Sequence, residues 1–431
     1  MKRPLTLFDV TCIGVNAIVG SSIFLFPARL AGLLGPASVL SFGVAAVLLG
    51  AIALCFAEAS SRFDGHGGPY LYTREAFGPT AGFAIGWMCW AAEILSWAAV
   101  ADGIALYLGF LGPVWSSVLV VKGIAVFVIV SMGAINFRGV KLGAWTSNFF
   151  TLAKLVPLAV LIAAGLPRVR LASLAPFAPH GWKPMGAACY LALFSYSGFE
   201  CVPVPAGEVD GASRNVPIAV VASMALAALV YMAVQLAAVA LVPNLASSAQ
   251  PLADAARVAL GPAGAAMIVA GAVISTTGFS AGAALGGPRY LVALGQSGDM
   301  PRWTSRLHPR FGTPDAAIAI TTGATLVCAL ALDFNRLVDI TVVVICAQYL
   351  ATCAAVPFLR RGGAASFHLL GGWLIPAGGA AATVWLAAQG GWAEARFSLW
   401  LLAAGFALRA LTRAFPSRQT LSDAAVTKGK S

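Results

Sequence analysis

The sequence predicts an all-α polytopic membrane protein, and three observations support this fold class. The chain of 431 residues is 59% apolar and only 10% charged, whereas about a quarter of the residues of an ordinary soluble domain are charged. Its mean hydropathy is +0.86. Its apolar residues form spans of about 20 residues or more, the length that a helix needs to cross a bilayer.

A window of that length predicts about twelve transmembrane helices, and no soluble domain is predicted between them. Their approximate ranges are 7–33, 37–61, 80–112, 114–135, 141–166, 184–207, 215–243, 262–296, 314–332, 336–358, 368–388 and 396–415. The basic N-terminus runs into an apolar stretch longer than that of a signal peptide, so the first helix is expected to remain in the mature protein.

The distribution of basic residues predicts the orientation in the membrane. With the N-terminus in the cytoplasm, the inside connections hold most of the 27 lysine and arginine residues. This bias predicts that both termini are cytoplasmic, and only the connection with Arg168, Arg170 and Lys183 runs against it. The basic residues form no stripe despite the net charge of +11, so nucleic acid is not an expected partner.

Metal, cofactor and enzyme chemistry are not expected from the motifs. The eight cysteines lie in apolar spans without a CxxC pair, so they are interpreted as packing residues. The sequence has no Walker, HExxH or GxSxG motif, and catalysis is therefore not predicted.

Two spans carry weak helix formers at their middle. The first is GVNAIVGSSIFLFP (Gly14–Pro27), and the second, five helices later, is FSYSGFECVPVPAGEV (Phe194–Val209) with Gly198, Pro203 and Pro205. Bare backbone inside a membrane is tolerated only where it lines a cavity or is buried in protein. Paired breaks in two halves of a chain are typical of a transporter with inverted repeats and a substrate site between them. Close helix packing by small residues is the alternative explanation.

The first break has the chemistry to hold a zwitterion. Free N–H groups and the positive dipole end of a helix that begins near Ser21 favour a carboxylate. Free carbonyls of a helix that ends near Ile18 favour an ammonium group. An α-amino acid carries both groups.

At these residues the sequence resembles the amino acid–polyamine–organocation (APC) superfamily, particularly bacterial amino-acid permeases with the LeuT-type five-plus-five inverted-repeat fold. The shared motifs follow in order along nearly the whole chain: GSSIF, GGPYLYTREAFGP, GFE, AGEV, SRNVP and HPRFGTP. The resemblance implies a transport core over residues 1–358, with helices 1–5 and 6–10 as the two repeats. It implies helices 11 and 12 over 359–415 and a cytoplasmic tail over 416–431. A monomer or homodimer in the lipid of a bacterial cytoplasmic (inner) membrane is expected.

The resemblance also implies roles for residues at the breaks. The carboxylate would lie against Gly20, Ser21 and Ser22, and the ammonium against Ile18, Phe194 and Ser197. Phe194 matches the family's occluding aromatic gate. Ser22 stands where the family more often has Gly, which favours small substrates.

Ionisable residues at membrane depth are functional hypotheses by default. Lys154 resembles the lysine that sodium-independent members place where sodium-coupled relatives bind a cation, so proton coupling is predicted there. A fixed ion pair and a snorkelling side chain are the alternatives. Glu200 either carries a proton or holds unwound N–H groups, and the second role is favoured. Ser275, Thr276 and Thr277 are expected neighbours of Lys154.

Other charged residues have weaker assignments. Glu93 shares a helix face with Cys89, and both are expected at the substrate side chain, where Glu93 could select a cationic amino acid. Asp102 is interpreted as making a packing hydrogen bond. Charges at the inner helix ends are interpreted either as an inside gate or as solvated groups; they are Glu58, Arg62, Glu75, Glu208, Asp210 and Arg214.

The function predicted is secondary active transport of α-amino acids by alternating access, with proton-coupled symport or exchange and without sodium. A polyamine or organic-cation antiporter and a sensor that binds without transporting are the alternatives. The sequence leaves open which amino acid is carried and in which direction.

Overall fold

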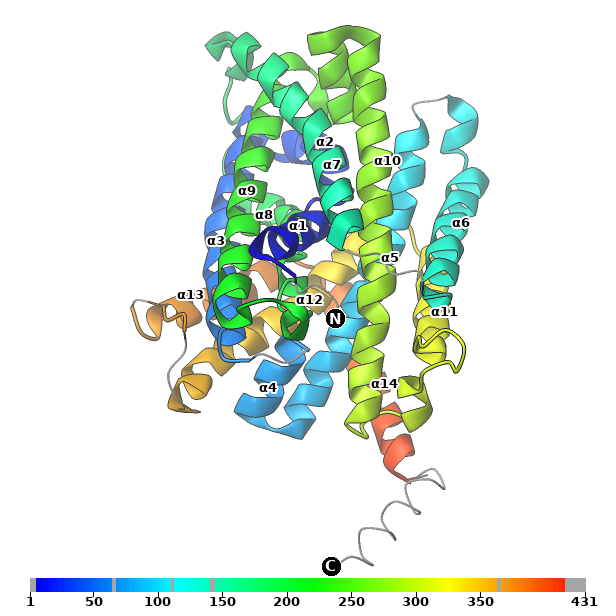
Figure 1. Ribbon diagram of the computed structural model, residues 1–431. Coiled ribbons are helices and arrows are strands. Elements are labelled where there is room, and N and C mark those ends of the chain that lie inside the picture. Colours follow the sequence, from blue (N-terminus) through cyan, green and yellow to red (C-terminus); the bar gives the residue numbers. More distant parts are fainter. Residues whose placement is uncertain are drawn as a thin grey trace, which may run out of the picture.

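The computed structural model is built from helices (Figure 1) and describes residues 5–63, 67–109, 112–139, 144–362, 366–369 and 371–414. The α-helices of the first half are α1 (Leu7–Ile18), α2 (Ser22–Leu34), α3 (Ser38–Ser60), α4 (Pro69–Phe77), α5 (Pro79–Leu108), α6 (Val118–Phe137) and α7 (Ala144–Gly165). Those of the second half are α8 (Met185–Tyr196), α9 (Ala212–Leu241), α10 (Pro251–Gln296), α11 (Asp315–Ala331), α12 (Phe334–Leu359), α13 (Leu374–Ala387) and α14 (Trp392–Ala414).

The helices identify a polytopic membrane protein. In the described part of the chain, eight helical stretches are long and apolar enough to cross a membrane, and α1, α11 and α13 are shorter apolar helices. Each predicted range contains a helix, although the number of crossings stays a prediction. One end of the molecule carries α4 and the C-terminal ends of α10 and α14 (Figure 1), and we refer to it as the α4 end.

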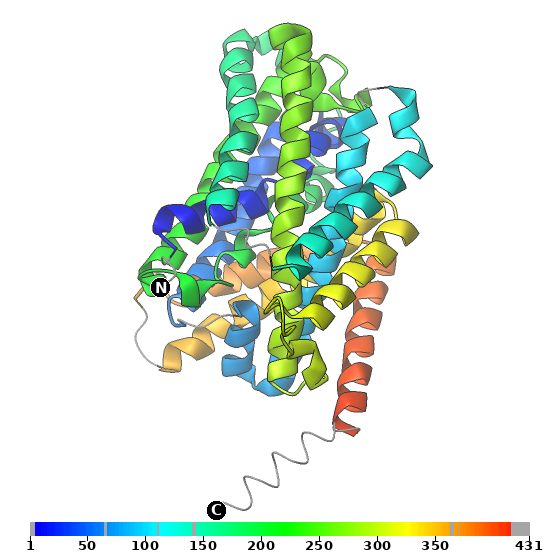
Figure 2. The same ribbon diagram turned by 45° about the vertical axis from the view of Figure 1, so that its right-hand side comes forward.

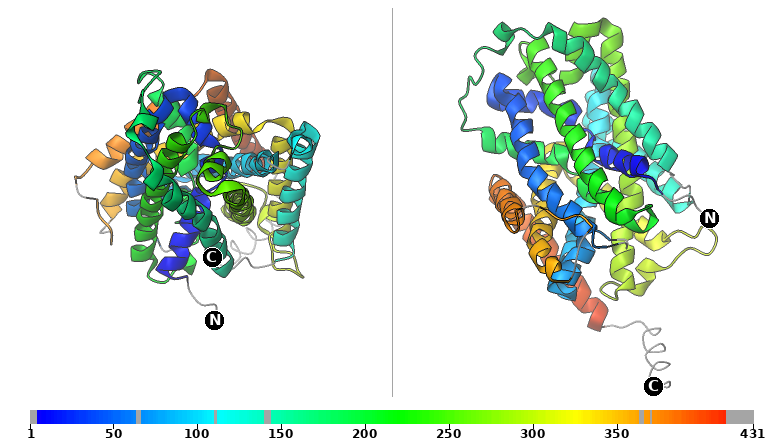
Figure 3. Two further views of the ribbon diagram at one scale, coloured as in Figure 1. Left: turned by 90° about the horizontal axis from the view of Figure 1, so that it is seen from above. Right: turned by 60° about the vertical axis from the view of Figure 1, so that its left-hand side comes forward.

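Helix α10 runs along nearly the full height of the molecule (Figure 1). Its 46 residues bend at Gly261, whose φ of 77° interrupts the helical backbone directly before Pro262. The helix packs against α5 and α7, while α3 and α9 lie side by side (Figure 3). Most of the site described below is built on α10, α5 and the two interrupted spans.

The first predicted break lies where the sequence places it. Helix α1 ends at Ile18 and α2 begins at Ser22. Thr6 and Asp9 form a capping box that begins α1. Close to the N-terminus, α1 runs across the long helices instead of along them (Figure 2).

The second break also lies where the sequence predicts it. Helix α8 ends at Tyr196, and the next segment contains two 3₁₀ turns, η6 (Phe199–Cys201) and η7 (Ala206–Glu208). Pro203 and Pro205, which mark the interruption in the sequence, lack the N–H that an α-helix needs.

The two breaks touch at Gly198. This residue has a φ of 124°, and a Cβ atom built there would lie 2.5 Å from the carbonyl carbon and oxygen of Ala17. Only glycine adopts this backbone conformation easily and leaves room for the other chain segment. The unwound backbone of the second break is thus packed against the last turn of α1.

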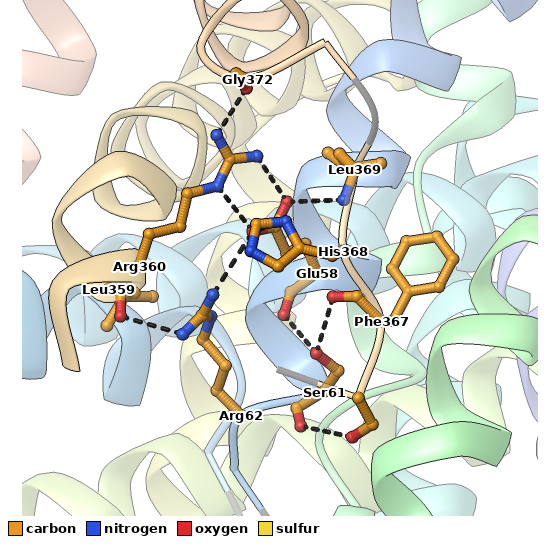
Figure 4. Close-up of polar contacts among 10 residues, drawn as sticks. Glu58, Ser61, Arg62, Leu359, Arg360, Phe367, His368, Leu369 and Gly372 are labelled. Atoms are coloured by element: carbon orange, nitrogen blue, oxygen red, sulfur yellow. Dashed lines mark hydrogen bonds and ion pairs between the residues drawn. The ribbon is translucent and has the colours of Figure 1, made fainter. Parts of the chain in front are cut away.

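A buried carboxylate joins α3 to Arg360, the residue that follows α12 (Figure 4). The Glu58 side chain is fully buried, and Arg360 Nε and Nη2 each donate to one of its oxygens at 2.7 Å. Arg62 Nη2 lies 3.5 Å from Glu58 Oε1, and the Leu369 N–H donates to Oε2 at 3.2 Å. Bidentate pairing and these further donors compensate for the removal of the carboxylate from water.

We expect Arg360→Ala to destabilise the protein by about 3 kcal/mol, because a buried carboxylate then loses its bidentate partner. Thermal unfolding in detergent measures the effect. The matched control is Arg361→Ala, since Arg361 lies over the Phe358 ring instead of Glu58. Equal melting temperatures for both variants would contradict the assignment.

We expect Gly198→Ala to prevent accumulation of folded protein, because the added methyl group meets the Ala17 backbone at a strained φ. Gly50→Ala is the control, since a Cβ there meets no atom within 4 Å. Fluorescence-detected size-exclusion chromatography compares the two, and a monodisperse Gly198→Ala peak of wild-type height would refute the expectation.

Candidate functional site

A cavity of about 470 Å³ lies beside the two breaks, a volume within the usual range of small-molecule pockets. Asn16 and Ala17 of α1 and Ser197 and Gly198 of the second break line it. Residues of α5, α10 and α12 complete its walls.

The cavity extends toward the α4 end. Glu208 and Arg289, which line it, are about half exposed and form an ion pair at 4.0 Å. Arg289 lies close to the C-terminal end of α10, which belongs to the α4 end (Figure 1). Next to this mouth, the Leu5 N–H donates to the Glu208 carbonyl at 2.9 Å and the Asp210 N–H to the Leu5 carbonyl at 3.0 Å.

The opposite side of the breaks is packed with aromatic rings. The buried Phe26 of α2 lies 5.9 Å from the Phe194 ring and 6.1 Å from the Phe334 ring, between centroids. Beyond them, Arg29 Nη1 donates to Asn335 Oδ1 at 2.9 Å. Phe194, the residue predicted as an aromatic gate, therefore belongs to a cluster of three phenylalanine rings around Phe26.

The predicted substrate residues fall into two groups. Cys89, Glu93 and Ser197 line the cavity, as does Glu200, which was not predicted to bind substrate. The cavity wall does not include the other predicted residues, which are all buried: Ile18, Gly20, Ser21, Ser22 and Phe194. The Ser21 hydroxyl finds no hydrogen-bond partner among the described residues.

The fully buried Lys154 of α7 lies at the first break. Its Nζ donates to the carbonyls of Val19 at 2.7 Å, Asn16 at 3.0 Å and Ser275 at 3.4 Å. In the part of the chain that the structure describes, no carboxylate lies within ion-pair distance of Nζ. The geometry thus fits neither a fixed ion pair nor a snorkelling side chain, and Lys154 Nζ occupies a cage of backbone oxygens.

Ser275 of α10 reinforces this cage. Its hydroxyl lies 2.9 Å from the Val19 carbonyl and 3.2 Å from the Gly20 carbonyl. The hydroxyls of Thr276 and Thr277, which were also expected neighbours of Lys154, donate instead to carbonyls of their own helix.

Two glutamates face the cavity with different partners. Glu200 Oε2 accepts the Gly198 N–H at 2.8 Å and the Tyr349 hydroxyl at 2.9 Å, which fits the favoured role of holding unwound backbone. Glu93 Oε1 accepts from the weak thiol donor of Cys201 at 3.2 Å. Glu93 therefore retains more capacity to bind a ligand than Glu200 does.

The sequence did not single out several residues of the site. Gln348, whose Oε1 accepts from the Cys89 thiol at 2.9 Å, lines the cavity from α12. Its amide and the neighbouring Tyr349 are polar groups inside an apolar span, which is the signal that could have revealed them.

The remaining charges occupy separate clusters. Asp102 Oδ2 lies 2.7 Å from Lys122 Nζ. Asp102 therefore makes the expected packing contact, and its partner is a charged side chain. Among the described residues, the predicted inside gate is divided, because Glu58 contacts Arg360 whereas Glu208 contacts Arg289.

Comparisons with known proteins agree with this architecture. The family model described as amino acid permease matches residues 5–404. The methylthioribose transporter of Bacillus subtilis is 28% identical over 330 residues, covering 73% of this chain and 72% of that protein. An uncharacterized transporter of Mycobacterium tuberculosis is 31% identical over 340 residues, covering 77% and 74%. The chloroplastic cationic amino acid transporter 9 of Arabidopsis thaliana is 30% identical over 330 residues, covering 72% and 58%. With its interrupted helices, its central cavity and this match over nearly its whole length, the chain belongs to the amino acid permease family of the APC superfamily.

Proposed function

We propose that this transporter carries α-amino acids across the bacterial cytoplasmic membrane by alternating access, coupled to protons and independent of sodium. The observation that carries the proposal is the pair of contacting breaks beside the cavity, because the helix ends that meet there present N–H groups and carbonyls, which match the two charges of an α-amino acid. In this proposal the twelve helices form a five-plus-five inverted repeat with both termini in the cytoplasm.

The substrate is held between the two breaks in this proposal. The N-terminal N–H groups of α2, around Gly20, Ser21 and Ser22, bind the carboxylate. The carbonyls of Ile18 and Ser197 bind the ammonium. The cavity reaches Ser197 but not the start of α2, so α1 and the second break must move before the substrate is fully enclosed.

Lys154 couples this movement to a proton. Its ammonium joins α7 to the carbonyls of α1 and α10. A charged donor binds carbonyl oxygens more strongly than a neutral one. Release of the proton therefore weakens the hold on α1, and rebinding restores it.

A polyamine or organic-cation carrier is the second candidate, and Glu93 favours it. This carboxylate lines the cavity with a thiol as its hydrogen-bond partner. A cationic amino acid would use the same carboxylate for its side chain, so Glu93 selects by charge in either case.

We expect Lys154→Ala to lose the stimulation of amino-acid uptake by an inward proton gradient, because the titrating cation is removed. Uptake of a labelled amino-acid panel into proteoliposomes, with and without the gradient, measures this. Lys183→Ala, at an exposed lysine, should keep the stimulation. Gradient-driven accumulation by Lys154→Ala would refute the coupling, and no uptake by the wild type would refute amino-acid transport.

We expect Glu93→Gln to raise KM for cationic amino acids about tenfold while changing KM for neutral ones less than twofold, since a charge-assisted hydrogen bond is lost. Competition uptake in proteoliposomes measures both. Glu75→Gln, at an exposed carboxylate on α4, is the control. Equal effects on both substrate classes would exclude selection by charge.

A further inference from the structure

Three polar side chains of α7 bind α1 at successive points along its length. Asn148 Nδ2 donates to Asp9 Oδ1 at 2.8 Å, in the first turn of α1. The Thr151 hydroxyl donates to the Cys12 carbonyl at 2.8 Å. One turn further along α7, Lys154 Nζ donates to carbonyls at the first break. The contacts follow in the same order along both helices, and we call these three contacts the α1–α7 ladder.

The spacing of the residues explains how a ladder forms. Side chains three or four positions apart lie on the same side of an α-helix. The donors on α7 follow at intervals of three residues, and their acceptors on α1, from Asp9 through Cys12 to Asn16, follow at intervals of three and four. Helix α1 is therefore bound to α7 along its length and not at the first break alone.

The two outer contacts also join α7 to the hydrogen bonds of α1 itself. Asp9 Oδ2 accepts the Thr6 N–H at 2.9 Å in the cap of α1, so the same carboxylate caps α1 and binds it to α7. A carbonyl oxygen has two lone pairs, so Cys12 accepts the Thr151 hydroxyl in addition to an N–H of its own helix. Thr151 is only 3% exposed, which keeps water from replacing this bond.

We propose that Asn148 and Thr151 are positioning residues, which hold α1 in register on α7 so that Lys154 Nζ meets the carbonyls of the first break. A helix that advances by one residue along its own screw moves about 1.5 Å and turns by about 100°. Such a slip carries those carbonyls away from Nζ. The effect on proton coupling rests on the function proposed above, whereas the docking of α1 on α7 does not.

The first test exchanges donor and acceptor at the outer contact. Asn148→Asp places two carboxylates against each other. Asp9→Asn combined with Asn148→Asp restores a hydrogen bond of reversed direction, and the new amide keeps one oxygen for the Thr6 cap. Amide hydrogen exchange of the full-length protein in nanodiscs is followed in peptides that cover residues 7–19. We expect exchange about fivefold faster in Asn148→Asp and within twofold of the wild type in the double variant.

Unchanged exchange in Asn148→Asp, or equal acceleration in the single and double variants, overturns the proposal.

The second test removes the middle contact. Thr151→Val keeps the shape of the side chain but has no donor, and we expect exchange over α1 about fivefold faster. The matched control is Thr383→Val, because the buried Thr383 hydroxyl donates to the Gly379 carbonyl of its own helix, α13, at 2.8 Å. Peptides of α14 should exchange equally in all the proteins. The proposal fails if Thr151→Val leaves α1 unchanged, accelerates α14 as much as α1, or matches its control.

Transport measurements separate a positioning role in coupling from a general defect. In proteoliposomes we expect Thr151→Val to lower gradient-driven accumulation of the labelled amino-acid panel about fivefold, and to leave exchange without a gradient within twofold. Unchanged accumulation, or equal losses in both assays, overturns the role in coupling. If the wild type neither accumulates nor exchanges amino acids, the proposed function fails, and hydrogen exchange still decides whether Asn148 and Thr151 hold α1.

Discussion

Backbone groups that an interrupted helix leaves unpaired must find partners inside the membrane, and the centre of this structure is arranged around that constraint. Side chains supply partners to several of these groups at the breaks: Lys154 and Ser275 donate to carbonyls of the first break. Glu200 holds the Gly198 N–H of the second. Without such partners, each exposed group would cost several kcal/mol in hydrocarbon.

The partners come from different helices, and this explains why breaks suit a moving protein. An intact helix bonds to itself, whereas here Lys154 of α7 and the Tyr231 hydroxyl of α9 contact carbonyls of α1, and Ser275 of α10 contacts a carbonyl of the first break. A shift of α1 therefore changes the hydrogen bonds between α1 and other elements, and the hydrogen bonds within each helix stay intact. The rings around Phe26 are buried, whereas the ion pair of Glu208 and Arg289 at the cavity is about half exposed.

The sequence predicted features that depend on local composition. Gly, Ser and membrane-depth charge revealed the first break between Ile18 and Ser22 and marked Lys154 as unusual. Gly198, Pro203 and Pro205 likewise revealed the second break, although apolar length alone could not show that 3₁₀ turns take the place of an α-helix there. Arg360 as the partner of Glu58 was also missed, since these residues lie 302 positions apart and many arginines were available.

The lysine cage also bears on how the chain is assembled. Lys154 and its acceptors Asn16 and Val19 all belong to the first 160 residues or so, whereas Ser275 and Tyr231 are synthesised later. During translation the first interrupted span therefore meets a donor before its other partners exist, because domains form from the N-terminal side as the chain emerges. The donor of the lysine cage and the α1 segment that it contacts are therefore both synthesised before Ser275, which completes the cage.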